Sequence, residues 1–70
     1  MEIVYTLHAK EYIKKRKIET VWVEETIKSP DETKREDHKY YVIKKLNGGT
    51  LKVIYVREKF IKVITTFFIQ

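Results

Sequence analysis

The sequence predicts an α+β fold in which two N-terminal helices pack on a three- to four-stranded antiparallel β-meander. Three observations predict it. Apolar residues recur at helical spacing in the first 28 residues, and β-branched and aromatic residues dominate from residue 40 onward. Asn47-Gly48-Gly49 divides this second half with residues typical of a tight hairpin turn. With 70 residues, the chain is expected to form one domain over residues 1–70 with one hydrophobic core.

The first helix is expected at Leu7–Arg16. Thr6 precedes it and is a favourable N-cap, because its hydroxyl can accept a hydrogen bond from an unpaired amide of the first turn. A helical periodicity of 100° per residue places Ala9, Tyr12, Ile13 and Arg16 on one side. His8 falls at the edge of this stripe. We therefore expect His8 at the border of the core and Arg16 beside it.

The second helix is expected at Thr20–Lys28. Ile18 and Val23 have the spacing of a hydrophobic staple around an N-cap at Glu19, although glutamate is a weak N-cap residue. Pro30 is incompatible with continuation of the helix and biases the residue before it away from helical geometry. The polar and charged segment 29–38 that follows is interpreted as a mobile loop.

The strands of the meander are predicted at residues 40–46, 51–56 and 60–68, with a second turn at Arg57-Glu58. If Asn47-Gly48 is a two-residue loop, Val42 pairs with Val53 and Tyr40 pairs with Tyr55. A three-residue loop shifts this register, and both possibilities stay open. Residues 3–5 are either a short strand or an extended lead-in.

Both faces of the predicted sheet carry apolar residues, and two helices can cover only one face. The other face should expose aromatic side chains from the set Tyr40, Tyr41, Phe60, Phe67 and Phe68. An uncovered apolar face is typical of a surface that binds a partner or forms a homodimer.

The net charge of +5 is unevenly distributed. Residues 1–17 hold five basic and two acidic residues, residues 18–37 hold three basic and seven acidic, and residues 38–70 hold seven basic and one acidic. The corresponding net charges are +3, −4 and +6. Basic surfaces attract phosphates or acidic proteins, although solvated lysines that maintain solubility would give the same composition.

Several classes of function are excluded by composition. Without cysteine, neither a disulfide framework nor a thiolate zinc site can form. No apolar run approaches the roughly 20 residues of a membrane span, and no signal peptide is visible, so a cytoplasmic protein is expected. Asn47 and Gln70 are the only amides, a composition typical of thermophiles. His8 and His38 lack the spacing of metal ligands, so no metal or other cofactor is predicted.

His8 is the best candidate for proton transfer, because an imidazole at the border of the core can titrate near neutral pH. A hydrogen-bonded boundary histidine is the structural alternative, and His38 is expected to be simply exposed to solvent. Arg16 lies two helical turns beyond His8 and can bind a phosphate through two parallel hydrogen bonds. An intramolecular ion pair with Glu19 or another acidic residue is the alternative for Arg16.

Thr65 and Thr66 interrupt an apolar strand and must point to opposite faces. One hydroxyl should therefore meet the core or a cleft, although threonine is also an ordinary strand residue. The side chains expected to contact a phosphate backbone are Lys10, Lys14, Lys15 and Lys17, together with Tyr12.

The order of these residues resembles a family of short prokaryotic proteins known as domain of unknown function 4258. The matching positions are His8-Ala9, Arg16, Ile18, Val23, Ile27, Pro30 and Thr65. The chain departs from the family pattern at Tyr12, where arginine is common, at Lys17, where glycine is common, and at Glu19, where serine is common.

This family is similar to RelE-like toxins, which share a fold with barnase-type and colicin-type ribonucleases. The resemblance implies metal-independent cleavage of RNA, including ribosome-bound mRNA, and a small antitoxin protein as partner. It implies that His8 is the general acid or base, that Arg16 stabilises the transition state, and that Thr65 orients the substrate or His8. Two alternatives stay open. The domain can be a non-catalytic module that binds nucleic acid or protein through its basic, aromatic sheet face, or a structural homo-oligomer.

Overall fold

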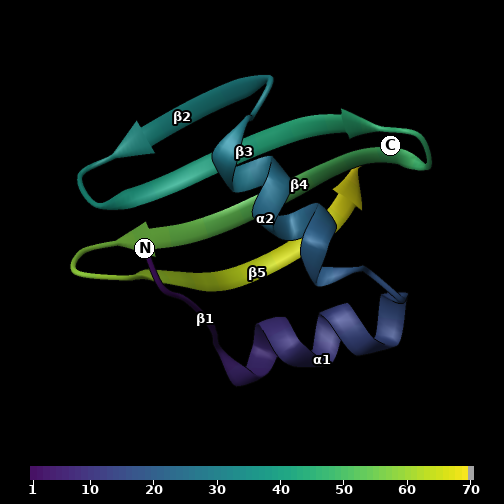
Figure 1. Cartoon of the computed structure of the whole chain (residues 1–70), viewed down its shortest axis with the longest axis horizontal. Coiled ribbons are helices and arrows are strands. Elements are labelled where there is room, and N and C mark those ends of the chain that lie inside the picture. The colour runs from purple at the N-terminus through teal and green to yellow at the C-terminus, as the bar shows by residue number, and fades with distance from the viewer. Residues whose placement is uncertain (70) are drawn as a thin grey trace.

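A computed structural model describes residues 1–69 and shows a five-stranded sheet with two helices (Figure 1). In chain order the elements are β1 (Ile3–Tyr5), α1 (Leu7–Arg16), α2 (Thr20–Lys28), β2 (Glu32–Glu36), β3 (Lys39–Leu46), β4 (Gly49–Arg57) and β5 (Ile61–Ile69). The strands lie in the order β1-β5-β4-β3-β2.

The sheet is mixed, because β1 runs parallel to β5 while all other neighbours are antiparallel. The predicted architecture, with two N-terminal helices and a purely antiparallel meander of three to four strands, is therefore wrong. The helices lie between β1 and the rest of the sheet in the sequence. Three residues are too few to show a strand periodicity, and Ile3 pairs with Ile61 at the other end of the chain. Such a contact leaves no local signal in the sequence.

The predicted loop over residues 29–38 is also wrong, because Glu32–Glu36 forms the edge strand β2. All five of its residues are exposed, so its sequence carries no alternation of buried and exposed positions. Its charged side chains suit an edge strand, since they discourage pairing with another chain. Asp37 follows with a φ of 56° and turns the chain into β3.

Both helices have the predicted bounds, and the predicted signals before them explain where they begin, a cap at Thr6 for α1 and the hydrophobic staple for α2. The Thr6 hydroxyl accepts a hydrogen bond of 3.1 Å from the Ala9 amide. Glu19 occupies the N-cap position of α2 but makes no capping hydrogen bond with its side chain. Ile18 and Val23 are both buried on either side of it, as expected for a hydrophobic staple.

The β3–β4 hairpin has a two-residue loop, because Leu46 pairs with Gly49, and this decides between the two registers that the sequence left open. Val42 consequently pairs with Val53, and Tyr40 pairs with Tyr55. Within Asn47-Gly48-Gly49 only Gly49 has a positive φ, at 143°. A Cβ atom at this position would lie 3.3 Å from the ring of Phe68, so glycine also allows β5 to approach closely.

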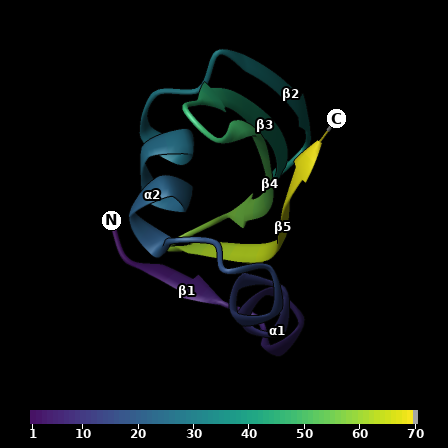
Figure 2. The same cartoon turned by 90° about the vertical axis from the view of Figure 1, so that its right-hand side faces the viewer.

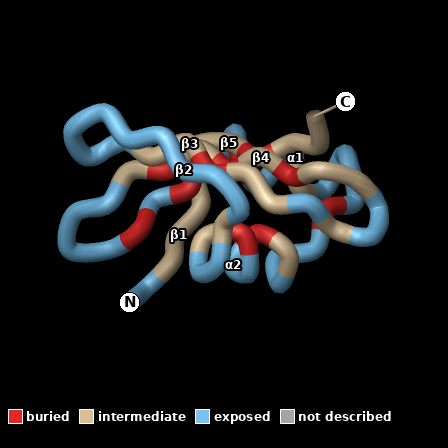
Figure 3. Tube along the Cα trace, turned by 90° about the horizontal axis from the view of Figure 1, so that it is seen from above, coloured by how far each residue is buried: buried red, intermediate tan, exposed pale blue. Residues whose placement is uncertain are grey.

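The two helices contact different parts of the sheet. α2 lies across β3 and β4 on one face, whereas α1 lies along the β5 edge beside β1 (Figures 1 and 2). Buried positions gather along the central strands and the inner side of α2, and β2 is exposed throughout (Figure 3). The buried apolar residues are Ala9, Ile18, Val23, Val42, Leu51, Val53, Tyr55, Ile61 and Val63. Neither helix of residues 1–69 has the length and apolar character that crossing a bilayer requires.

Neither helix covers the second face of the sheet, which we call the open face. Of the expected aromatic residues, Tyr41 and Phe67 lie on it, since they alternate with the buried Val42 and Thr66. Its residues, taken from the register, are Glu32, Lys34 and Glu36 of β2, Lys39, Tyr41, Ile43 and Lys45 of β3, Thr50, Lys52, Ile54 and Val56 of β4, and Lys62, Thr65, Phe67 and Ile69 of β5.

The other aromatic residues of the expected set lie elsewhere. Tyr40 and Phe68 pack against the core, where Tyr40 stacks on Tyr55 with ring centroids 5.0 Å apart. Phe60 is exposed in the turn between β4 and β5.

Lys17 ends α1 in the left-handed conformation, with φ 55° and ψ 44°. A side chain costs roughly 1–2 kcal/mol in this region, and glycine avoids this cost while losing more entropy on folding. We expect Lys17→Gly to raise the free energy of unfolding by about 0.5–1 kcal/mol in urea denaturation. Lys15→Gly removes the same charge from the interior of the helix and should lower the free energy of unfolding by about 1 kcal/mol. If Lys17→Gly lowers the free energy of unfolding as much as Lys15→Gly, the left-handed conformation of Lys17 carries no cost that glycine relieves.

Tyr5 and Tyr55 should make the fold sensitive to alkaline pH. Burial raises the pKa of both phenols above 10.0, helped by Glu24 at Tyr5 and by Tyr40 at Tyr55. A raised pKa in the folded state means that stability is complete below pH 10 and falls as the pH rises through the folded value. The Tyr5 hydroxyl is buried without a hydrogen-bond partner. Tyr5→Phe should therefore raise the free energy of unfolding at neutral pH by about 1 kcal/mol and flatten its alkaline decline. If the free energy of unfolding declines equally with rising pH in wild type and in Tyr5→Phe, Tyr5 does not contribute to the alkaline sensitivity.

Candidate active site

Thr6 fixes the position of α1 against β5. Its amide donates to the Val63 carbonyl at 3.0 Å, and its hydroxyl donates to the Ile64 carbonyl at 3.0 Å. The same hydroxyl oxygen accepts from the Ala9 amide in the first turn of α1. The start of the helix is therefore joined to the middle of β5.

β5 has an irregularity at this point. Tyr55 pairs with Val63 and Ile54 pairs with Thr65, so Ile64 is an extra residue in β5. A β-bulge of this kind changes which face the following side chains occupy, and bulges are frequent beside functional sites. Beyond the bulge, Thr66 is fully buried on the covered face and Thr65 lies on the open face, so the two threonines point to opposite faces as predicted.

Three side chains of α1 form one stripe toward β5. His8, Tyr12 and Arg16 are four residues apart, so they lie on the same side of the helix. The rings of His8 and Tyr12 meet edge to face, with centroids 4.5 Å apart. The Arg16 guanidinium carbon lies 5.4 Å from the Tyr12 ring centroid. Because both distances end at this centroid, the imidazole and guanidinium centres are less than 10 Å apart.

This stripe and β5 enclose a shallow hollow of about 340 Å³, which we call the α1 hollow. Its walls are His8, Tyr12 and Arg16 of α1 and Thr65 and Phe67 of β5. Among residues 1–69, Tyr5 and Thr65 carry buried side-chain oxygens without a hydrogen-bond partner. The arrangement offers an imidazole that can transfer protons and a fixed positive charge on the α1 wall, and an unpaired hydroxyl on the β5 wall.

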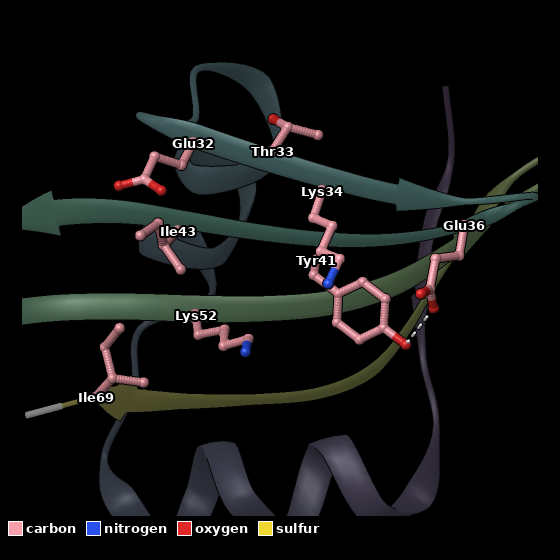
Figure 4. Close-up of a pocket in the computed structure, with 8 residues that line it drawn as sticks. All are labelled: Glu32, Thr33, Lys34, Glu36, Tyr41, Ile43, Lys52 and Ile69. Carbon is pink, nitrogen blue, oxygen red and sulfur yellow. Dashed lines mark hydrogen bonds between the residues drawn. The ribbon is translucent and has the colours of Figure 1, made fainter.

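A second hollow, of about 520 Å³, lies on the open face between β2 and β5 (Figure 4). We call it the open-face hollow. It is lined by Glu32, Thr33, Lys34, Glu36, Tyr41, Ile43, Lys52 and Ile69. The Tyr41 hydroxyl donates to Glu36 Oε1 at 3.4 Å, and in the view of Figure 4 the ammonium groups of Lys34 and Lys52 both lie on the side of the ring away from Glu36.

With this geometry established, one comparison identifies the family. The family model "Domain of unknown function (DUF4258)" matches residues 5–68. The chain belongs to this family. No curated protein and no solved structure matches it. The family match spans both hollows apart from Ile69, and it includes every residue that the sequence suggested for chemistry.

In the DUF4258 domain, the three residues predicted to carry chemistry lie together. His8, Arg16 and Thr65 all line the α1 hollow, although Thr65 is far from the helix in the sequence. The predicted burial is wrong for two of them, because His8 and Arg16 are exposed. α1 contacts the edge of the sheet instead of its face, so only a narrow stripe around Ala9 is fully covered. The Arg16 guanidinium contacts the Tyr12 ring.

The predicted nucleic-acid-binding residues divide into two groups. Tyr12 is half-buried and lines the α1 hollow. The lysines of α1 and its cap are exposed and surround the helix without lining that hollow, namely Lys10, Lys14, Lys15 and Lys17. In the DUF4258 domain these four lysines form a positively charged border around α1. Within residues 1–69, no group of three or more His, Asp or Glu side chains is arranged to hold a metal ion.

Sequence reasoning missed Phe67 of β5 in the α1 hollow and the residues that β2 contributes to the open-face hollow. Phe67 was expected only as an exposed aromatic residue, yet it lines the α1 hollow. Lys34 and Glu36 were assigned to a loop, so their position beside Tyr41 was not expected. The available signal was Asp37 itself, because aspartate tolerates the left-handed conformation that this turn requires.

Thr65 and Thr66 allow a matched test of the unpaired hydroxyl. Thr65→Val removes a buried oxygen without a partner and should leave the free energy of unfolding unchanged or raise it by about 1 kcal/mol. The Thr66 hydroxyl donates to the Lys52 carbonyl at 2.9 Å, so Thr66→Val should lower the free energy of unfolding by about 1 kcal/mol. Urea denaturation measures both. Destabilisation by Thr65→Val as large as by Thr66→Val would show that the Thr65 hydroxyl has a structural partner.

Proposed function

We propose that this DUF4258 domain is the toxin of a toxin–antitoxin pair, a RelE-like endonuclease that cleaves RNA without a metal ion. The observation that carries the proposal is the α1 hollow, where His8, Arg16 and Thr65 line one accessible surface. An RNA phosphodiester bound above Tyr12 lies between the imidazole and the guanidinium. The resemblance of the family to RelE-like toxins supports the same chemistry.

The reaction uses a nucleophile that RNA itself supplies. The ribose 2′-oxygen attacks the neighbouring phosphorus, a new O2′–P bond forms, and the P–O5′ bond breaks. A general base takes the proton of the 2′-hydroxyl, and a general acid delivers a proton to the departing 5′-oxygen. His8 performs one of these transfers, because an imidazole can accept or donate a proton near neutral pH. The products are a 2′,3′-cyclic phosphate and a 5′-hydroxyl.

Arg16 stabilises the negative charge that accumulates on the phosphoryl oxygens in the transition state. A guanidinium is always charged and can donate two parallel hydrogen bonds to two phosphate oxygens. Its cation–π contact with Tyr12 restrains the side chain before substrate binds. Tyr12 therefore contacts both the His8 imidazole and the Arg16 guanidinium.

Thr65 orients the substrate or the imidazole. A buried hydroxyl without a partner costs folding free energy, and a ribose hydroxyl or phosphate oxygen that enters the hollow would supply the missing hydrogen bond. The exposed lysines of α1 and its cap attract the phosphate backbone over a longer range.

The biological partners in this proposal are RNA, including ribosome-bound mRNA, and a small antitoxin protein. Expression in bacteria should arrest growth, and co-expression of the antitoxin encoded beside the toxin should restore it. His8→Ala should abolish the arrest at equal protein levels.

A second candidate function is RNA binding without cleavage. The uncovered open face favours it, because Tyr41 lies there among several lysines. Salt-dependent binding of RNA by a protein that leaves every phosphodiester intact would select this candidate.

The decisive experiment is cleavage of a labelled single-stranded RNA in the presence of a chelator. His8→Ala should reduce the cleavage rate by about 10²- to 10⁴-fold, the usual contribution of a general acid or base. Arg16→Ala should reduce it by about 10²- to 10³-fold, because it removes a charge-stabilising donor. Circular dichroism checks that each variant is folded.

Two exposed residues outside the hollow serve as controls. His38→Ala removes the other histidine, which lies in the β2–β3 turn, and Arg57→Ala removes an arginine at the end of β4. Both variants should cleave RNA at the wild-type rate. If His8→Ala and Arg16→Ala also keep full activity, the proposed active site is wrong.

A further inference from the structure

The open face has an aromatic ring, Tyr41, with two lysines over the ring and the Glu36 carboxylate at its hydroxyl, and a ring beside cations is a combination suited to a nucleotide. Tyr41 lies half-buried near the centre of the open face. Lys39 Nζ lies 5.4 Å from the centroid of its ring, and Lys52 Nζ lies 5.8 Å from it. The ring projects from β3 between the side chains of β2 and β4 (Figure 4).

These cation–π contacts are weak enough to be exchanged. At an exposed site an ammonium ion gains less from an aromatic ring than a nucleobase gains by stacking on it. A base that stacks on Tyr41 displaces Lys39 or Lys52 from the ring. The displaced ammonium stays beside the base, where it can pair with the phosphate of the same nucleotide.

The register places Tyr41 in line with the α1 hollow. Thr65 pairs with Ile54, and Ile54 pairs with Tyr41, so the three residues form one row across β5, β4 and β3. Two strand spacings separate the ends of this row, which is about 10 Å. Figure 4 shows α1 along the border of the same face, beyond β5. A strand of RNA with one phosphate in the α1 hollow can therefore place a nearby base on Tyr41.

The charge of the open face also fits a phosphate backbone. Its five lysines are Lys34, Lys39, Lys45, Lys52 and Lys62, and its two carboxylates, Glu32 and Glu36, both lie on the edge strand β2. The carboxylates repel phosphate at this border, so the backbone is directed over β3, β4 and β5. A protein partner fits this surface less well, since the centres of protein interfaces are depleted of lysine.

We propose that Tyr41 is the base-stacking residue of a site for single-stranded RNA. In this site Lys39 and Lys52 bind the phosphate of the stacked nucleotide. The site binds a nucleotide near the phosphodiester that lies in the α1 hollow. This inference rests on the proposed function, because it assigns the path of the same RNA substrate across the open face.

The test measures RNA binding apart from cleavage. A fluorescent single-stranded oligonucleotide with 2′-O-methyl groups throughout cannot be cleaved by attack of a 2′-hydroxyl, and fluorescence anisotropy gives its Kd. Tyr41→Ala should raise the Kd by about 5- to 100-fold, the loss expected for one stacked base. Tyr41→Phe keeps the ring and should bind within about twofold of wild type.

Controls on the same chain separate stacking from general attraction. Phe60→Ala removes an aromatic ring that is 37% exposed in the β4–β5 turn and should leave the Kd unchanged. Lys52→Gln should reduce the slope of log K against log salt by about 0.7, the value for one phosphate contact on a single strand. Lys28→Gln, at the end of α2, should leave this slope unchanged.

The outcomes distinguish the two proposals. If Tyr41→Ala binds the oligonucleotide as tightly as wild type, the stacking site is wrong even when RNA is cleaved. If Tyr41→Ala weakens binding and wild type cleaves no RNA, the site stands and the endonuclease is wrong. If wild type binds no oligonucleotide at low salt, the RNA site is overturned, and a protein partner becomes the better explanation of the open face.

Discussion

Thr6 carries the interaction on which the arrangement of the domain depends. Its three hydrogen bonds connect the end of β1, the first turn of α1 and the bulged part of β5. β1 is only three residues long, and α1 packs on the edge of the sheet instead of its face. The hydrogen bonds of one threonine therefore fix the height at which the His8–Arg16 stripe meets Thr65. A longer β1 or a helix packed flat on the sheet would be held by more contacts and would depend less on the hydrogen bonds of Thr6.

The elements with strong local signals were predictable from sequence. α1 and α2 have the predicted bounds, because each combines helical periodicity with an N-terminal signal, Thr6 for α1 and the Ile18–Val23 staple for α2. The β3–β4 hairpin was predictable as an element from Asn47-Gly48-Gly49, but its register was open between a two- and a three-residue loop until the pairing of Leu46 with Gly49 decided it. The remaining topology depends on contacts that are distant in sequence or on charged residues. β1 pairs in parallel with the last strand, and β2 consists of exposed positions that look like a loop.

The same distinction applies to the candidate site. The helical spacing placed Arg16 in the core-facing stripe of α1 and His8 at its edge, and in the structure both line the α1 hollow. Their exposure depends on which part of the sheet α1 meets. Thr65 was expected on one of two faces, and the bulge at Ile64 decides which. Without that extra residue, the alternation along β5 would turn the Thr65 hydroxyl toward the core and Thr66 toward the open face. A single-residue irregularity in a ladder has no recognisable sequence signal here, so this part of the site required the structure.

The uneven charge along the chain becomes a separation in space once the chain folds. The acidic segment 18–37 forms α2, which covers one face, and β2, which borders the other. The basic segments form α1 and the strands β3, β4 and β5, which line the α1 hollow and half of the open-face hollow, whereas β2 lines the other half. Anionic polymers are therefore attracted to the side that holds both hollows and repelled from the side that α2 occupies. This field acts over roughly 10 Å at moderate salt, a range that extends across the row from Thr65 to Tyr41. The five lysines of the open face outnumber its two glutamates, which both lie on the edge strand β2, so a single phosphate backbone can approach both hollows over β3, β4 and β5.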